Sequence, residues 1–315
     1  MDSGSKTDAI AFEFPPYLRI YKNGRAKRTQ EVEFIPPSID LVTGVSSKDV
    51  VIEPETGLSA RLYLPKVKDR LSKLPLLIYF HGGGFCTESA FSPLYHPYVD
   101  SLVAEAKVVA ISVNYRRAPE HPLPMCYEDS WTSLKWVVSQ SKEEAWLKDN
   151  VDFTRVFLAG DSAGANIAHN MAVRAGCSAL NGLKINGLVL IHPHFAGVEP
   201  FKSEIGNFGV KIAGNLWRAV YPLTTGLDDP FVNPDKDPNF SRLGCKRVLV
   251  CIAEKDIFRD RGQFYCENLR KSRWDGKVEF MEAEGENHVF HLYNPTCKRA
   301  KDLMKCVVSF INTSE

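Results

Sequence analysis

The chain has 315 residues, 44% of them hydrophobic and 24% charged, which is the composition of a soluble globular protein large enough for one α/β domain. Its 39 basic and 38 acidic residues leave a net charge of +1, so charge gives no reason to expect a nucleic-acid or membrane partner. The polar amino terminus is followed by no signal-peptide core, and no apolar run reaches 18 residues. We therefore expect a cytoplasmic protein that acts on a small molecule, with a monomer and a dimer both open.

The eight cysteines form no C-x-x-C pair, and no group of cysteine and histidine has zinc-binding spacing. Several of them stand in apolar runs, such as Cys251 in the stretch 248–252. This pattern is typical of buried free thiols in a reducing compartment. We expect neither a metal site nor a cofactor.

The first 45 residues contain the pairs Pro15-Pro16 and Pro36-Pro37. Because proline interrupts regular structure, we expect an irregular arm with one or two helical turns, packed against another part of the protein. Residues 49–53 and 58–64 alternate between apolar and polar side chains, which predicts two strands joined by a turn at 54–57.

A continuous apolar run at 74–80 predicts a buried strand, which ends abruptly in the glycine-rich segment 81–85. Three prolines in the segment 118–124 exclude regular structure there. The elements expected around that segment are a helix over 95–106, a buried strand over 107–113 and an amphipathic helix over 127–140.

The segment Gly160-Asp161-Ser162-Ala163-Gly164 has the form G-x-S-x-G. A buried strand over 155–159 is expected before it and a helix over 163–175 after it. Such a sharp turn needs small residues at both glycine positions and leaves Ser162 strained, with its hydroxyl exposed above the sheet. This is the pattern of a nucleophile elbow, although an ordinary strand–helix turn with a capping serine has the same residues.

The remaining chain continues the alternation of strands and helices, which predicts a mostly parallel sheet with helices on both faces and an active site beyond the carboxyl ends of its strands. The strands are expected at 187–193, 247–253 and 278–283, and the helices at 262–272 and 295–312. Residues 195–240 interrupt the alternation. We interpret them, with about 1–45, as a cap on a single domain that spans 1–315.

A serine nucleophile needs a base and an orienting acid, which follow it in the order serine, acid, histidine in α/β-hydrolases. Asp256 directly follows the strand over 247–253, whereas Asp229 lies in the expected cap, so Asp256 is the candidate acid. His288 lies in the loop after the last strand and is the candidate base; His291 is closer to the terminal helix, where it is expected to pack.

Stabilising an oxyanion requires several N–H groups aimed at one point. The glycine loop after the strand over 74–80 supplies flexible backbone for this, and we expect the donors to be Gly83, Gly84 and Ala163. A phosphate-binding loop is the alternative. The segment lacks the Lys-Ser/Thr of a P-loop and the spacing of a dinucleotide-binding fold.

The segments 81–85, 115–122, 160–164, 253–256 and 288–291 together resemble the plant carboxylesterase family, within the hormone-sensitive-lipase-like α/β-hydrolases. The resemblance covers the chain from about residue 75 to its end. It implies the α/β-hydrolase fold, Ser162 as nucleophile, Asp256 as orienting acid, His288 as base and a glycine-loop oxyanion hole. It also implies that Arg116 and Glu120 support the loops.

The chain departs from the family pattern at Asn114 and Arg117, where Asp and Leu are usual, and at Ala196, where an aromatic residue is common. None of these positions belongs to the expected triad. The smaller side chain at Ala196 is expected to widen the substrate cavity.

The leading functional interpretation is a serine carboxylesterase that acts on small, apolar or aromatic plant metabolites. Its expected substrate pocket includes Phe85, Phe195 and Val289. A lyase or cyclase of specialised metabolism that reuses the same groups is the alternative, because the family includes isoflavanone dehydratases and alkaloid cyclases. The dehydratases tend to carry threonine in place of the serine, and the family's hormone receptors lose the catalytic histidine, so Ser162 and His288 favour the esterase.

Overall fold

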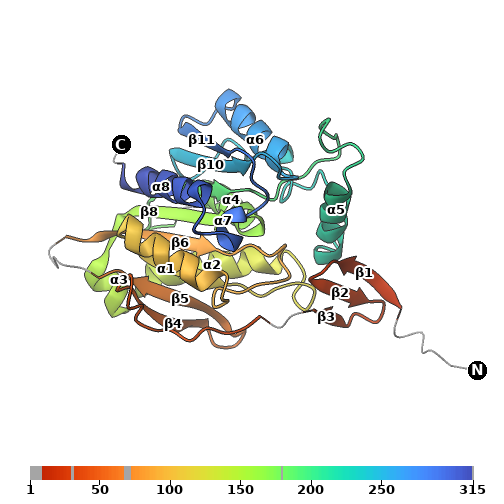
Figure 1. Ribbon diagram of the computed structural model, residues 1–315. Helices are drawn as coiled ribbons and strands as arrows, with labels where there is room; N and C mark the ends of the chain where they lie inside the picture. The colour runs from red at the N-terminus through yellow and green to blue at the C-terminus, as the bar shows by residue number, and fades with distance from the viewer. Residues whose placement is uncertain (1–8, 30–31, 67–71, 179, 314–315) are drawn as a thin grey trace, which may run out of the picture.

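A mixed eight-stranded sheet forms the centre of the computed structural model, which describes residues 9–29, 32–66, 72–178 and 180–313 (Figure 1). The strand order is β11-β10-β9-β8-β6-β7-β5-β4, with β6 to β11 parallel and β4 and β5 antiparallel at one edge. The strands are β4 (Ser46–Glu53), β5 (Leu58–Leu64), β6 (Leu74–Phe80), β7 (Val109–Asn114), β8 (Val151–Asp161), β9 (Ile185–Ile191), β10 (Arg247–Ala253) and β11 (Lys277–Ala283).

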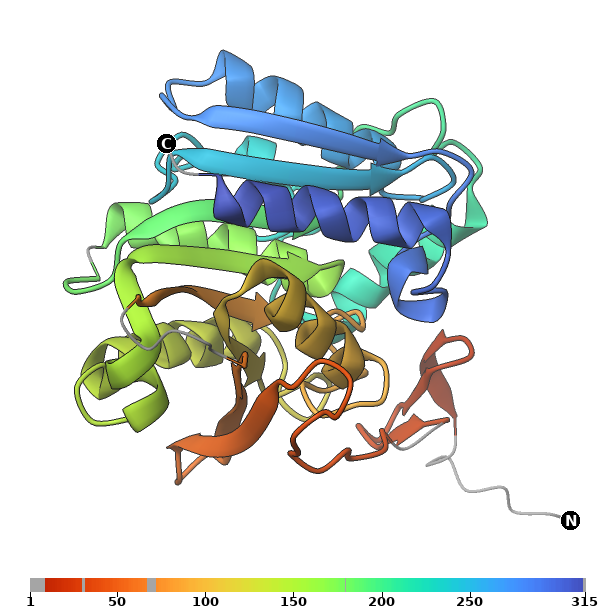
Figure 2. The same ribbon diagram turned by 60° about the vertical axis from the view of Figure 1, so that its left-hand side comes forward.

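Helices cover both faces of this sheet (Figure 2). One face packs against α1 (Tyr95–Ala106) and α8 (Lys298–Asn312). The opposite face packs against α2 (Met125–Gln140), α3 (Ala145–Asn150), α4 (Ala163–Cys177) and α6 (Arg259–Lys271). Successive residues of a strand point to opposite faces, so a strand buried on both sides reads as the unbroken apolar run seen in β6 and β10.

The amino-terminal segment differs from the irregular, partly helical arm that its prolines predict. It forms a separate antiparallel sheet of β1 (Ile10–Phe14), β2 (Leu18–Tyr21) and β3 (Ala26–Arg28). Pro15-Pro16 occupies the turn between β1 and β2, so the prolines end a strand instead of preventing one. The second turn is closed by Asn23, whose side chain accepts from the Arg25 N–H, and by Gly24 with φ of 82°.

The segment 195–240 contains one long helix, α5 (Phe208–Val220), and the short 3₁₀ helix η2 (Pro234–Lys236). The end of α5 lies against β1 of the small sheet, beyond the carboxyl ends of the central strands (Figure 1). Residues 1–8 and 30–31 of the predicted cap lie outside the described residues.

Other expected elements agree with the structure within a few residues, and β5, β6, β10 and α1 have the expected bounds. The short helix α3 was not expected. The helix expected over 295–312 is shorter, because Pro295 separates α8 from the single turn α7 (Phe290–Tyr293).

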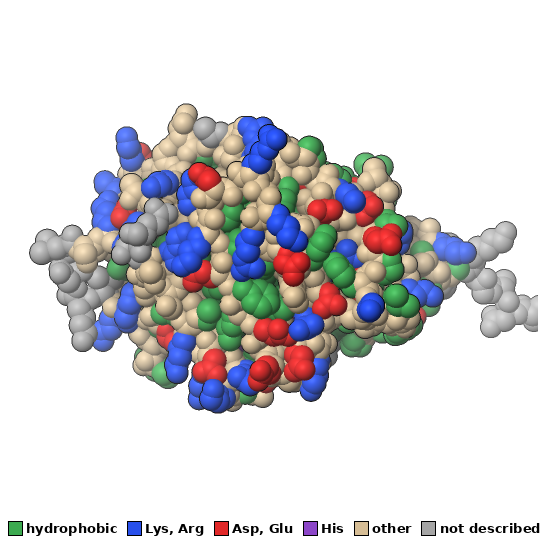
Figure 3. Space-filling view, turned by 90° about the horizontal axis from the view of Figure 1, so that it is seen from above, with side chains coloured by type: hydrophobic (Ala, Val, Ile, Leu, Met, Phe, Trp, Pro, Cys, Tyr) green, Lys and Arg blue, Asp and Glu red, His purple; other side chains and the backbone are tan. Residues whose placement is uncertain are grey.

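Acidic and basic side chains are interspersed on the face above β11 and α6, without a large patch of one sign (Figure 3). Within the described ranges, every helix is too short or too polar to cross a bilayer.

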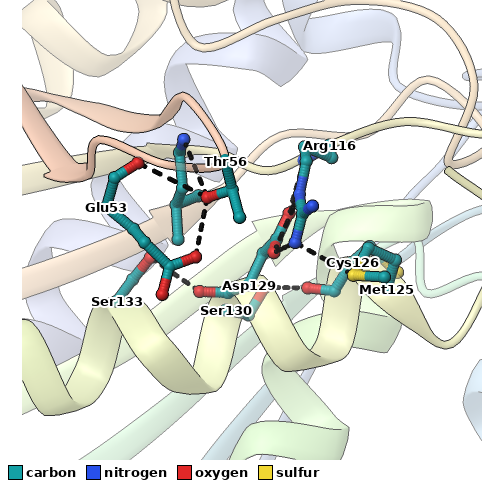
Figure 4. Close-up of polar contacts among 9 residues, drawn as sticks. Glu53, Thr56, Arg116, Met125, Cys126, Asp129, Ser130 and Ser133 are labelled. Carbon is teal, nitrogen blue, oxygen red and sulfur yellow. Dashed lines mark hydrogen bonds and ion pairs between the residues drawn. The ribbon is translucent and has the colours of Figure 1, made fainter.

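The loop after β7 is anchored to helix α2 (Figure 4). The buried carboxylate of Asp129 accepts from the backbone N–H of Arg116 at 2.9 Å and from its guanidinium at 2.6 Å. The neighbouring Tyr115 donates its hydroxyl to the carbonyl of His81 at 2.8 Å. Through these contacts α2 and the β7 loop support the start of the glycine loop.

Candidate active site

Ser162 stands in the turn between β8 and α4 with the strained backbone that the elbow pattern predicts. Its φ is 51° and its ψ is −119°, a conformation that non-glycine residues rarely adopt. A Cβ on Gly160 would lie 2.4 Å from the backbone of Gly164, and one on Gly164 would lie 1.9 Å from the Phe80 carbonyl oxygen. The two glycines therefore allow the close backbone approach on which the turn depends.

Ser162, His288 and Asp256 form one hydrogen-bonded line. His288 Nε2 lies 2.8 Å from Ser162 Oγ, and its Nδ1 lies 2.7 Å from Asp256 Oδ2. Asp256 follows β10 and His288 follows β11, so the parallel strands bring residues far apart in sequence to one edge of the sheet. The second oxygen of Asp256 accepts from the Phe258 N–H at 3.0 Å, which fixes the carboxylate.

The charge distribution favours ionised Asp256 beside His288. Burial works against the charge of Asp256, but the charge and hydrogen bond of His288 lower the pKa of this carboxyl below its ordinary value. Burial also opposes a charged His288, yet Asp256 raises the pKa of the imidazole above its ordinary value, and Asp161 adds to this. The site thus favours a charged imidazolium at His288 next to an ionised carboxylate at Asp256.

The other histidines near the site are buried and support it. His192 Nδ1 accepts from the Val289 N–H at 2.9 Å, which holds the loop that carries His288. His291 is buried in α7 and packs against Tyr98, with ring centroids 4.9 Å apart. Among the described residues, one group has the side chains and proximity of a possible metal site, namely His192, Asp256 and His288. The Asp256–His288 hydrogen bond and the His192–Val289 contact account for this clustering.

The expected oxyanion donors lie beside Ser162. Gly83 and Gly84 line the same cavity as the serine and have φ of 90° and 58°, so both adopt the left-handed backbone that favours glycine. Ala163 is the first residue of α4, directly after Ser162. The N–H groups of these three residues have no hydrogen-bond acceptor within the described part of the chain, as the first N–H groups of a helix and an open oxyanion site require.

A buried network behind the glycine loop was not expected from the sequence. Asp161 accepts from Tyr79 at 2.8 Å and from Tyr95 at 2.7 Å, and Tyr95 in turn accepts from the Gly82 N–H at 2.8 Å. Burial raises the pKa of Asp161 to about 6 although both tyrosine hydrogen bonds lower it. The available signal was Asp161 itself, a charged residue directly between a buried strand and the candidate nucleophile.

The cavity above Ser162 has a volume of about 430 Å³ and an apolar wall. Its lining combines the elbow, the glycine loop, the small sheet, α5 and the loops after β10 and β11. The apolar members include Phe14, Pro15, Leu94, Ile212, Ala213, Leu216, Ile257, Phe258 and Val289.

Val289 lines this cavity as expected, but Phe85 and Phe195 do not. Phe85 has φ of 64° and packs its fully buried ring against Trp217 at 5.8 Å. Phe195 stacks on Tyr265 at 5.1 Å in the core beside α6. Both rings fill the protein interior, where an aromatic residue is as common as in a pocket. The expectation for Ala196 is also wrong, because it lies outside the lining of the catalytic cavity.

Comparisons with known proteins agree with this architecture. The family model for the α/β hydrolase fold matches residues 77–292. "Probable carboxylesterase 2" of Arabidopsis thaliana is 46% identical over 309 residues, which cover 97% of this chain and 98% of the relative. The 2-hydroxyisoflavanone dehydratase of Glycyrrhiza echinata is 45% identical over 322 residues, covering 98% of both.

Solved structures give the same result. A hyperthermophilic esterase from the archaeon Pyrobaculum calidifontis superimposes with a TM-score of 0.72 at 27% identity, over 84% of each chain. The EstE1 carboxylesterase, cloned from a metagenomic library, has a TM-score of 0.71 at 27% identity, over 84% of this chain and 88% of that chain. This chain therefore belongs to the α/β-hydrolase family, and within it to the group of plant proteins that contains the probable carboxylesterases and the dehydratase.

Proposed function

We propose that the protein is a carboxylic ester hydrolase that works through an acyl-enzyme on Ser162. The observation that carries this proposal is the hydrogen-bonded line from Ser162 Oγ through His288 to Asp256. A relative named as a probable carboxylesterase and two structural neighbours named as esterases support it.

In the proposed reaction, His288 Nε2 takes the proton from Ser162 Oγ as the oxygen attacks the ester carbonyl carbon. The negative charge that develops on the carbonyl oxygen is stabilised by the N–H groups of Gly83, Gly84 and Ala163. His288 then gives its proton to the departing alcohol. A water molecule, deprotonated by His288, attacks the acyl-enzyme and releases the acid and free Ser162.

The substrate is proposed to be a small molecule, bound under a cap that completes a single α/β-hydrolase domain. Phe14 of the small sheet and Leu216 of α5 line the cavity that contains Ser162, which supports a cap formed by these two regions. The apolar wall favours an apolar or aromatic ester, such as those of plant specialised metabolism. All eight cysteines are unpaired, which supports a reducing compartment such as the cytosol.

A lyase is the second candidate, because a relative that is 45% identical along the whole chain is named as a dehydratase. Such a reaction would use His288 as an acid and base without a covalent bond to Ser162. The esterase remains the better-supported proposal, since the serine lies within 2.8 Å of the base with three free N–H groups beside it.

The proposal is tested by measuring short acyl ester hydrolysis by the wild type and Ser162→Ala. The variant is expected to lose roughly four or more orders of magnitude in kcat, while its thermal unfolding stays close to that of the wild type. In parallel, a fluorophosphonate is expected to add mass to the peptide that contains Ser162. A variant that retains a tenth of the activity would show that Ser162 is not the nucleophile.

A further inference from the structure

One acidic side chain outside the triad stands in the wall of the catalytic cavity. Glu88 follows the glycine loop, and it also lines an adjoining groove of about 760 Å³. Its side chain is half-buried. Within the described residues its carboxylate forms no ion pair or hydrogen bond, unlike that of Glu120, which is paired with Arg28.

The backbone holds Glu88 in a conformation that is unfavourable for its residue type. Its φ is 63°, in the left-handed region, which costs free energy for a residue other than glycine. The guanidinium of Arg117 donates to the Glu88 carbonyl oxygen at 2.6 Å and clamps this turn. Arg117 is one of the positions at which the chain departs from the family pattern, so the clamp belongs to this chain's own sequence.

Two tyrosine rings stand at the same boundary. Tyr17 of the small sheet and Tyr293 of α7 line both the catalytic cavity and the outer groove, and both are exposed, by 42% and 63%. Tyr17 is supported from below by Phe14, with ring centroids 5.3 Å apart. A carboxylate beside aromatic rings is the usual protein environment for an organic cation, because the ring faces and the acid are both negative.

The electrostatic influence of Glu88 extends into the cavity. Burial raises the pKa of Tyr95 well above its ordinary value, and Asp161 and then Glu88 add to this effect. Besides His194 and His288, the basic side chain in the cavity lining is Lys255, which is exposed and belongs to the loop that carries Ile257. A half-buried acid is screened less by solvent than an exposed base, so the mouth near Glu88 favours positive charge.

We infer that Glu88, Tyr17 and Tyr293 form a subsite for an ammonium group of the substrate, at the boundary between the catalytic cavity and the outer groove. The subsite rests on the proposed ester hydrolysis and specifies its substrate class. The ester would carry an apolar part in the cavity above Ser162 and a protonated or quaternary amine at Glu88.

The experiment uses pairs of acetate esters that differ in one atom. Each pair has an alkyl chain ending in either trimethylammonium or its uncharged carbon isostere, tert-butyl, and the chain length is varied over the series. The ratio of kcat/KM within each pair is divided by the ratio for hydroxide-catalysed hydrolysis, because the ammonium group activates the ester. At the best chain length, the wild type is expected to prefer the cation by about fivefold or more.

Glu88→Gln is expected to reduce this preference to about one. Because the preference is a ratio within each pair, a change in turnover that is common to both esters cancels. Glu33→Gln makes the same charge change on an exposed residue that lines only the outer groove. It is the matched control and is expected to leave most of the preference intact.

The subsite is wrong if neutral esters are hydrolysed through Ser162 but no chain length gives a cation preference, or if Glu88→Gln keeps that preference. A preference for an anionic ester would also contradict the subsite, and would indicate that Lys255 determines the charge preference at the mouth of the cavity.

If no ester is turned over and Ser162 takes no label, the proposed function fails. Calorimetry with butyltrimethylammonium then tests the subsite separately. Binding by the wild type that weakens at least about fivefold in Glu88→Gln would support it, and equal binding or none would refute it.

Discussion

At the scale of single residues, the ionisation of His288 determines when Ser162 is activated in the proposed mechanism. The imidazole must be neutral to accept a proton, and Asp256 raises its pKa above the ordinary value of 6.5. We therefore expect kcat/KM for a neutral ester to rise with pH through an apparent pKa above 6.5, and to fall as His288 becomes protonated at lower pH.

Asp256→Asn tests the cause of this shift. Burial lowers the pKa of His288, and without the Asp256 carboxylate only the smaller effect of Asp161 opposes it, so the rising limb of the profile is expected to move to lower pH. The maximal kcat is also expected to fall by about 10³–10⁴-fold, because the imidazole loses its orienting partner. An unchanged midpoint in this variant would show that Asp256 does not set the pKa of His288.

Tyr95 connects Asp161 to the glycine loop, and its hydroxyl is the acceptor of the Gly82 N–H. Tyr95→Phe leaves this N–H without a partner and is expected to lower kcat by about tenfold with a smaller change in KM. The matched control is Tyr79→Phe, since Tyr79 also donates to Asp161, whereas the Gly82 N–H donates to Tyr95. Each change is expected to cost about 1–3 kcal/mol of stability. Equal losses of kcat in the two variants would contradict the role of Tyr95 in positioning the loop.

At the scale of secondary-structure elements, Arg28 connects the small sheet to the active-site loops. Its guanidinium donates to the carbonyl oxygens of Cys86 and Ala118 at 2.7 and 2.8 Å and pairs with Glu120. Arg28→Ala is expected to loosen the attachment of β1–β3. KM is expected to rise about three- to tenfold with little change in kcat, because a smaller fraction of the protein then has the small sheet in place against the cavity.

Arg19→Ala is the control for that measurement, since Arg19 forms an exposed pair with Glu13 inside the same small sheet. Its KM is expected to match the wild type. Limited proteolysis of both variants adds a structural readout, with faster cleavage near residues 9–29 expected in Arg28→Ala alone. Equal KM values in both variants would show that the attachment of the small sheet does not contribute to substrate binding.

The sequence predicted the central elements better than the segments that cover them. Strands such as β6 and β10 are buried on both faces, so their apolar runs are unbroken and their bounds are readable. The small sheet was missed because its strands are only three to five residues long and Pro15-Pro16 stands between two of them. Short strands of this kind depend on tertiary contacts, here with α5, more than on local preference.

At the scale of the whole molecule, the parallel sheet is the reason why the candidate site was predictable. Ser162, Asp256 and His288 each follow a different strand, and parallel strands end at one edge. The cavity lining was less predictable, because its residues come from many segments that are far apart in the sequence. An aromatic side chain such as Phe85 gives no local sign of whether it faces a cavity or the core.

The measurement that tests the central proposal most directly is the hydrolysis of a short acyl ester in heavy-oxygen water, with mass analysis of both the acid and the enzyme. The acid is expected to carry one heavy oxygen from water, and rapid acid quenching is expected to trap the acyl group on the peptide containing Ser162. Under the same conditions, Ser162→Ala is expected to give neither product nor adduct. Consumption of the ester without label in the acid, or labelled acid formed at the wild-type rate by Ser162→Ala, would contradict the acyl-enzyme mechanism.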